Sequence, residues 1–113
     1  MSTALSLSHL TTPVAHIVTW RLNGATPQAR RQQADRVAQA FEALRAEVPG
    51  LLRMEVGANL SDAPDAWDVA LCMVFASVAD LRRYETHPVH LEIKALVGPM
   101  RAQRGQADFA AAA

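Results

Sequence analysis

The chain has 113 residues, half of them hydrophobic, and its 11 Lys and Arg residues balance 11 Asp and Glu residues. This length suits one domain with a core of its own. The lack of net charge argues against a nucleic-acid or an anionic-membrane partner, because both normally select a basic face.

Cys72 is the single cysteine of the chain, which excludes an intrachain disulfide and fits a reducing, cytoplasmic setting. Residues 1–13 lack the positive start and the apolar run of a signal peptide, and we expect them to form a flexible leader. No stretch approaches the roughly 20 apolar residues that a membrane-spanning helix needs. We therefore expect a soluble cytoplasmic protein without a membrane partner.

A strand and a helix are the first predicted elements. Residues 14–22, VAHIVTWRL, are rich in β-branched and aromatic side chains, which predicts a strand. Thr26 is suited to cap a helix, and Pro27 to occupy its first position. Apolar residues then recur at spacings of three and four as far as Val48, where a Pro-Gly pair follows. This pattern predicts an amphipathic helix.

Two further strands are expected in the middle of the chain. Residues 51–59 alternate between apolar and charged side chains, which predicts a half-buried strand. Leu52, Met54 and Val56 are expected on its core side. Residues 66–76 predict a third strand, apolar without interruption in its second half.

The last third of the chain predicts two helical pieces and an edge strand. Ser77 and Asp80 have the spacing of a capping box, which opens a short helix. Pro88 interrupts this helix and begins a second piece, which a Gly-Pro pair closes. Residues 106–110 are expected to form the final edge strand.

The order of these elements is β-α-β-β-α-β, which predicts the ferredoxin-like α+β fold. In this fold an antiparallel sheet carries both helical regions on one face. We expect a single domain over residues 14–110 and a short tail over residues 111–113.

The third strand suggests a partner, because both of its faces are apolar. One face carries the large side chains of Val69, Leu71, Met73 and Phe75, and the other the small ones of Ala70, Cys72, Val74 and Ala76. Helices on one side of the sheet cover only one of these sets. We expect the sheet of a second copy to cover the other, which gives a dimeric α+β barrel with a two-fold interface. The alternative is a central strand whose second face is a modest apolar patch in a monomer.

The segment DLRRYETHPVHLE, residues 80–92, places Tyr84, the only tyrosine, close to two of the four histidines, His87 and His90. In one continuous helix Tyr84 and His90 would project from different faces. Because Pro88 breaks the helix, both side chains can turn towards one space. His16 lies on the apolar side of the first strand, where an imidazole is costly unless it is hydrogen-bonded. We therefore predict a pocket shared by His16, Tyr84 and His90.

A purely structural role is the alternative for each of these residues. His87 is expected to cap the second helical piece, and Tyr84 and His16 would also fit as core residues with satisfied polar atoms. The His87-x-x-His90 spacing is also found in metal-ligand pairs, but no cysteine or carboxylate cluster completes a site. We expect neither a metal nor a cofactor.

The chain resembles the stress-responsive A/B barrel (Dabb) domain family. The resemblance rests on HIVTWRL, VPGLLRMEVGAN, WDVALCMVFASVADLRRYETHPVHLEI and the closing ADF, and its most specific element is the string Tyr-x-x-His-Pro-x-His at residues 84–90. It implies a ferredoxin-like protomer and a dimeric barrel. One branch of the family contains polyketide cyclases that work without a cofactor, and their working residues correspond to Tyr84, His90 and His16. A further tyrosine of the cyclase pocket has no counterpart here.

Two function classes follow from these residues, with a third reading beside them. In the first, the chain is a cofactor-free acid–base enzyme of the cyclase, lyase or isomerase type for a small apolar carbonyl compound, with His90 as base. Tyr84 and His16 would assist, and Trp20, Phe41 and His87 are candidate ligand-binding residues. In the second, the same pocket binds a small ligand without turnover in a stress-associated dimer. The third reading is a purely structural dimeric module.

Overall fold

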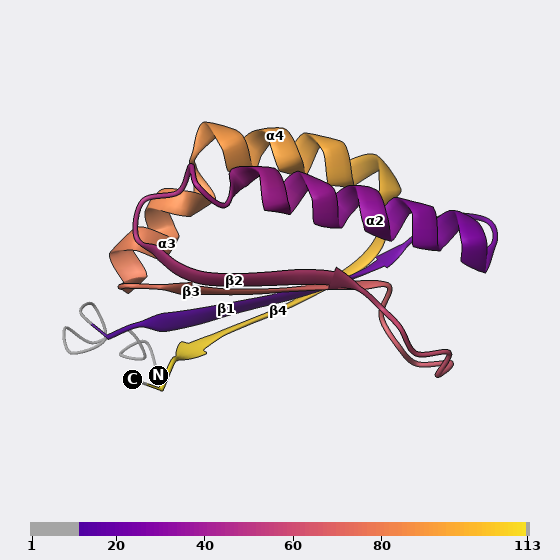
Figure 1. Cartoon of the computed structure of the whole chain (residues 1–113), viewed down its shortest axis with the longest axis horizontal. Helices are drawn as coiled ribbons and strands as arrows, with labels where there is room; N and C mark the ends of the chain where they lie inside the picture. Colours follow the sequence, from indigo (N-terminus) through magenta and orange to yellow (C-terminus); the bar gives the residue numbers. More distant parts are fainter. Residues whose placement is uncertain (1–11, 113) are drawn as a thin grey trace.

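The computed structural model describes residues 12–112 as a four-stranded antiparallel sheet with helices on one face (Figure 1). Residues 1–11 of the expected leader and residue 113 of the expected tail lie outside this range. The strands are β1 (Val14–Leu22), β2 (Leu51–Ala58), β3 (Val69–Phe75) and β4 (Arg101–Ala110). The helices are α2 (Pro27–Leu44), α3 (Val78–Glu85) and α4 (Pro88–Val97), and a short 3-10 turn, η2 (Gly98–Met100), leads into β4.

The strand order across the sheet is β2-β3-β1-β4, so the two strands nearest in sequence to the chain ends, β1 and β4, are neighbours. This arrangement confirms the predicted α+β, ferredoxin-like protomer. Within the described residues, no helix is long and apolar enough to cross a membrane.

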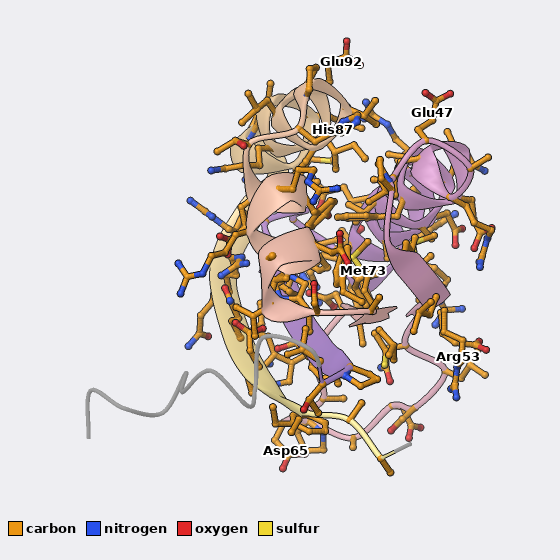
Figure 2. The ribbon with its side chains drawn as sticks, turned by 90° about the vertical axis from the view of Figure 1, so that its left-hand side faces the viewer. Glu47, Arg53, Asp65, Met73, His87 and Glu92 are labelled. Atoms are coloured by element: carbon orange, nitrogen blue, oxygen red, sulfur yellow. The ribbon has the colours of Figure 1, made fainter. Side chains whose placement is uncertain are left out.

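The core fills the layer between the sheet and the helices. The large side chains of β3 face this layer and are buried, as Met73 in the middle of the molecule shows, whereas Glu47 and Glu92 point outwards (Figure 2). Trp20 of β1 packs against Phe41 of α2, with ring centroids 5.5 Å apart. The small side chains of β3 lie on the opposite, outer face, where Ala70 is exposed and Cys72 and Val74 are half-buried.

Local signals predicted the starts of the helices correctly. Thr26 caps α2 by accepting a hydrogen bond from the backbone N–H of Ala29, and Ser77 caps α3 in the same way through Asp80. His87 caps α4, because its ring nitrogen accepts from the backbone N–H of Val89 at 3.1 Å.

Four boundaries or directions differ from the prediction. The helix expected to reach Val48 ends at Leu44. After that point the guanidinium of Arg45 donates to Glu42 and to the carbonyl of Met54, which ties the chain to β2 in a turn. Val48 is nevertheless buried in the core, although it lies beyond the end of the helix. Its spacing of four from Leu44 therefore does not indicate a continued helix.

The third strand begins at Val69 and not at residue 66. Trp67 and Asp68 are used in tertiary contacts instead: the guanidinium of Arg21 lies 4.5 Å from the Trp67 ring centre, and the Asp68 carboxylate accepts from the backbone N–H of Leu22. These contacts join the preceding loop to the end of β1.

Leu52 does not share the core side with Met54. The register shifts between Leu51 and Arg53, so Leu51 pairs with Phe75 and Leu52 is displaced in a bulge with 59% of its surface exposed. The bulge lets Leu51 pack against the core in its place.

The final strand begins at Arg101, five residues earlier than expected, and pairs with the whole of β1. The first half of β4 is polar and shows no apolar alternation, so its sequence pattern does not predict a strand. Backbone hydrogen bonds to β1 hold it in place. This longer strand brings new charged residues to the pocket described next.

Candidate active site

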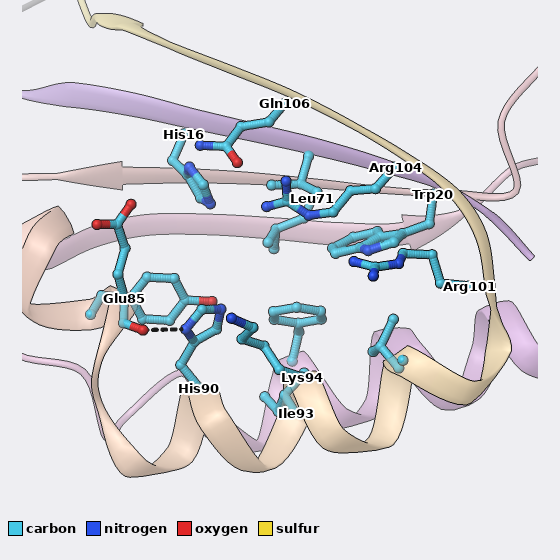
Figure 3. A pocket seen from close by; sticks show the side chains of 15 residues that line it. His16, Trp20, Leu71, Glu85, His90, Ile93, Lys94, Arg101, Arg104 and Gln106 are labelled. Carbon is cyan, nitrogen blue, oxygen red and sulfur yellow. Dashed lines mark hydrogen bonds between the residues drawn. The ribbon is translucent and has the colours of Figure 1, made fainter.

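A cavity of about 410 Å³ lies between α4 and the inner faces of β1 and β4 (Figure 3). Its apolar lining comes from both layers and includes Val18 and Trp20 of β1, Leu71 of β3 and Phe41 of α2. A space of this size and composition suits a small organic ligand.

His16 projects into the cavity from β1 and is only 4% exposed (Figure 3). Its Nδ1 lies 2.6 Å from Oδ1 of Asp108 on β4, the residue directly opposite in the strand register. The second carboxylate oxygen of Asp108 accepts from the side-chain amide of Gln106. Because an ionised carboxylate only accepts hydrogen bonds, Nδ1 of His16 carries a hydrogen, and in the neutral tautomer the lone pair is on Nε2.

His90 reaches the same cavity from the first turn of α4. Its Nδ1 is 3.1 Å from the backbone carbonyl oxygen of Glu85, the last residue of α3 (Figure 3). A carbonyl oxygen is an acceptor only, so Nδ1 of His90 also carries the hydrogen and Nε2 is the basic nitrogen. The helix break at Pro88 makes this contact between α3 and α4 feasible.

Tyr84 is close to both imidazoles. Its ring centroid is 4.3 Å from that of His90 and 6.2 Å from that of His16, and Phe75 packs against it at 5.3 Å. Tyr84 is buried at the end of α3 and lines the cavity. The three rings predicted to share a pocket are therefore adjacent in space.

Burial shifts the pKa values of His90 and Tyr84 in opposite directions, and both shifts favour the neutral form of the ring. It lowers the pKa of His90, to which the positive charges of Lys94 and Arg104 and the nearby His16 also contribute, while the hydrogen bond to Glu85 opposes the change. Burial raises the pKa of Tyr84 above its ordinary value, against a smaller opposite effect from Arg104. Near neutral pH the site thus holds a neutral imidazole beside a neutral phenol.

The structure places the other predicted site residues in two different ways. Trp20 and Phe41 line the cavity. His87 is not among the lining residues, because its ring turns to the start of α4, where it forms the cap described above. Among residues 12–112, no three His, Cys, Asp or Glu side chains gather closely enough to hold a metal ion.

Several residues of the site were not predicted. Asp108, Gln106, Arg104 and Arg101 come from β4, Lys94 from α4 and Glu85 from α3. The available signal was the period of two in β4: residues 104, 106 and 108 share the inner face opposite Trp20, Val18 and His16. The expected strand over residues 106–110 already contains residues 106 and 108, and its extension back to Arg101 adds Arg104 and Arg101.

The sequence of the chain matches the family model described as the stress responsive A/B barrel domain over residues 14–111. The chain belongs to this Dabb family. The match covers the sheet, the helices and the candidate site, and it confirms the resemblance drawn from the Tyr-x-x-His-Pro-x-His string. The family assignment agrees with the ferredoxin-like protomer described above.

Known proteins similar to this Dabb chain include bacterial and plant examples. An uncharacterized protein of Streptomyces coelicolor is 31% identical over 77 residues, which cover 68% of this chain and 78% of the relative. A dimeric ferredoxin-like protein of unknown function from Thermobifida fusca is 30% identical, with a TM-score of 0.78 and coverage of 94% of this chain and 97% of that one. The hydroxynitrile lyase of Passiflora edulis shares the fold at 23% identity, with a TM-score of 0.73 and coverage of 90% and 95%.

Proposed function

We propose that this Dabb protein is an acid–base enzyme that binds a small carbonyl compound in the cavity and needs no cofactor. One observation carries the proposal. Two imidazoles, His16 and His90, have Nδ1 engaged by an acceptor, and both line a cavity that also holds the phenol of Tyr84. This geometry supports a base and a hydrogen-bond donor acting on one substrate.

The proposed first step is a proton transfer from carbon to nitrogen. Nε2 of His90 takes a proton from the carbon next to the substrate carbonyl, and the electron pair of the broken C–H bond moves into the carbonyl, forming an enolate. The Tyr84 hydroxyl, kept protonated by its raised pKa, donates a hydrogen bond to the enolate oxygen. The carbonyl of Glu85 stabilises the imidazolium that forms on His90.

His16 has a supporting role in this proposal. Its Asp108 partner fixes the direction of the ring, so that Nε2 is available to accept a hydrogen bond from a polar substrate group. The enolate can then attack a second carbonyl of the same molecule, be reprotonated elsewhere, or expel a leaving group. The hydroxynitrile lyase of Passiflora edulis is an enzyme with the same fold, which supports a catalytic role for such a chain.

The outer face of the sheet supports a two-fold dimer as the working form. Ile17 of β1 lies opposite Cys72 of β3 and Ala107 of β4, so a strip of small or apolar side chains crosses this face. The similar protein of Thermobifida fusca is dimeric. Face-to-face packing of two such sheets would cover the strip in a closed barrel.

Deuterium exchange tests the proposed base without knowledge of the natural substrate. A panel of aryl-alkyl ketones, beginning with 4-phenyl-2-butanone, is incubated with the protein in D₂O, and exchange next to the carbonyl is followed by NMR. We expect the wild-type protein to accelerate exchange and His90→Gln to reduce the enzymatic rate by about a hundredfold or more. Tyr84→Phe, which keeps the ring packing, should reduce the same rate while leaving ketone binding intact.

The same experiment separates the enzyme from a ligand-binding protein. Saturable binding of the ketones without exchange above the buffer rate would contradict catalysis and favour the non-catalytic class. An unchanged rate in folded His90→Gln would remove His90 as the base. Circular dichroism and thermal unfolding of each variant establish that the fold is retained.

A further inference from the structure

Three cationic side chains line the same cavity as the acid–base residues. Lys94 reaches it from α4, one turn after His90, and Arg101 and Arg104 reach it from β4 (Figure 3). Among the lining residues the only carboxylate is that of Glu85, which Figure 3 shows at the opposite end, beyond His90. This local excess of positive charge contrasts with the zero net charge of the chain.

These cations have no anionic partner in the part of the chain that the structure describes. The ion pairs found there join His16 to Asp108, Arg45 to Glu42 and Arg83 to Asp80. Arg21 and Arg30, by contrast, donate to backbone carbonyl oxygens. The hydrogen-bonding capacity of the cavity cations is therefore available to a ligand.

The guanidinium of Arg104 is solvent-exposed in part and is perturbed by its surroundings in the cavity. Burial lowers the pKa of its guanidinium, and the charge of Arg101 lowers it further, although Asp108 and Tyr84 act in the opposite direction. An anion bound between the two arginines would offset both the lost hydration and the mutual repulsion.

The strand register relates the position of Arg104 to that of His16. Arg104 lies opposite Trp20, and Asp108 lies opposite His16, which is four residues later in β4 and four residues earlier in β1. The side chain of Arg104 extends from β4 into the cavity that His90 and Tyr84 also line (Figure 3). The apolar surface of Trp20 and Phe41 lies in the same cavity.

We propose that the ligand of this cavity is a carbonyl compound that also bears a carboxylate, with Arg104 and Arg101 binding the carboxylate and Lys94 adding charge. The planar guanidinium matches a carboxylate with two parallel hydrogen bonds, which fits this anion. A short apolar body would lie on Trp20 and Phe41, and the carbonyl would reach Tyr84 and His90. This inference rests on the proposed function, whose site it specifies further.

Binding of a matched pair of compounds tests the carboxylate. The pair is 4-oxo-4-phenylbutanoate and its methyl ester, which share the aromatic ketone and differ in charge, and their affinities are measured by isothermal titration calorimetry at low salt. We expect the carboxylate to bind at least about tenfold tighter than the ester, because one hydrogen bond between charged groups supplies that difference. Added NaCl should weaken binding of the carboxylate and leave the affinity for the ester almost unchanged.

Variants assign the preference to individual residues. Arg104→Gln should remove most of the carboxylate preference and keep the affinity for the ester, and Arg101→Gln should act in the same direction. Arg36→Gln, which changes an exposed arginine of α2 outside the cavity, is the matched control and should change neither affinity.

The possible outcomes separate this inference from the proposed function. The carboxylate inference alone is overturned if the ester binds as tightly as the carboxylate or more tightly. It is also overturned if Arg104→Gln lowers the affinity for both compounds equally. A retained carboxylate preference with no exchange of ketone deuterons supports the inference and contradicts catalysis. If neither compound binds at millimolar concentration, the carboxylate inference is overturned.

Discussion

At the scale of single residues, the chemistry of the site depends on what each ring nitrogen contacts. A carboxylate holds Nδ1 of His16, and a backbone carbonyl holds Nδ1 of His90. Both acceptors select the tautomer whose lone pair is on Nε2. For His90, burial and nearby positive charge add a second effect, a lowered pKa, so the ring is neutral where a general base has to be.

The lowered pKa of His90 predicts how stability changes with pH. The unfolded chain binds a proton on this residue at a higher pH than the folded chain, so the free energy of unfolding falls as pH drops below about 6.5. The loss continues until the lower folded-state pKa is passed. In His90→Gln this contribution is absent.

Urea unfolding of wild type and His90→Gln from pH 7.5 to pH 5 measures the effect. The wild type should lose stability relative to the variant on acidification, because the two proteins differ only at residue 90, whose pKa is lowered on folding. The lowered pKa of His90 would be contradicted if the difference in free energy of unfolding between the two proteins stays constant across this range. It would also be contradicted if the wild type becomes more stable relative to the variant at low pH.

At the scale of elements, the break between α3 and α4 assembles the site. Tyr84 is near the end of α3 and His90 is in the first turn of α4. His87 caps α4 at the break, with extended backbone geometry, and Pro88 takes the first helical position. The cap therefore fixes where α4 begins, and with it the direction from which His90 enters the cavity.

Removal of the cap should affect both stability and function. We expect His87→Ala to lower the free energy of unfolding by about 1 kcal/mol, the usual effect of losing an N-cap acceptor. Ketone exchange should also slow, because His90 is less firmly positioned, and His87→Asn, which retains a capping acceptor, should restore much of both losses.

Thr26→Ala is the matched control for this prediction, since Thr26 caps α2 away from the three rings. It should lower stability by a similar amount without slowing exchange. Equal exchange rates in the His87→Ala and Thr26→Ala variants would show that His87 contributes to stability alone.

At the scale of the whole molecule, the sheet has two different faces. The inner face carries the core and the cavity, and the outer face carries the apolar strip that crosses β3, β1 and β4. A single chain leaves Ala70, which lies two residues before Cys72 on the same face of β3, exposed. The proposed dimer covers the strip without using the cavity face, so each protomer would keep its own site.

A charge on the outer face should therefore separate the protomers. Ala70→Asp adds a carboxylate to an exposed position and removes no core side chain, so we expect a folded monomer with unchanged secondary structure. Light scattering after size-exclusion chromatography measures the mass, and Ala95→Asp on the exposed surface of α4 is the matched control that should stay dimeric. A wild-type monomer, or an Ala70→Asp dimer of unchanged affinity, would contradict this interface.

Much of the fold and part of the site can be predicted from this sequence. Strand β1 has the expected bounds, and the capping residues Thr26 and Ser77 mark the true helix starts. His16, Tyr84 and His90 were also expected to meet, because the helix break and the face of β1 are local features. The bulge at Leu52 and the early start of β4 were missed, since they depend on pairing with other strands and not on local pattern.

Local sequence thus determined the order of the elements, the buried sides of β1 and β3 and the three rings of the site, because capping, proline geometry and side-chain period act between neighbouring residues. Only the tertiary structure decided which partners those rings receive. Asp108 and Arg104 come to the site through the register of β4 on β1, across 92 residues in the case of His16 and Asp108. Such a pairing is selected by the whole sheet, so no short segment of the chain contains it.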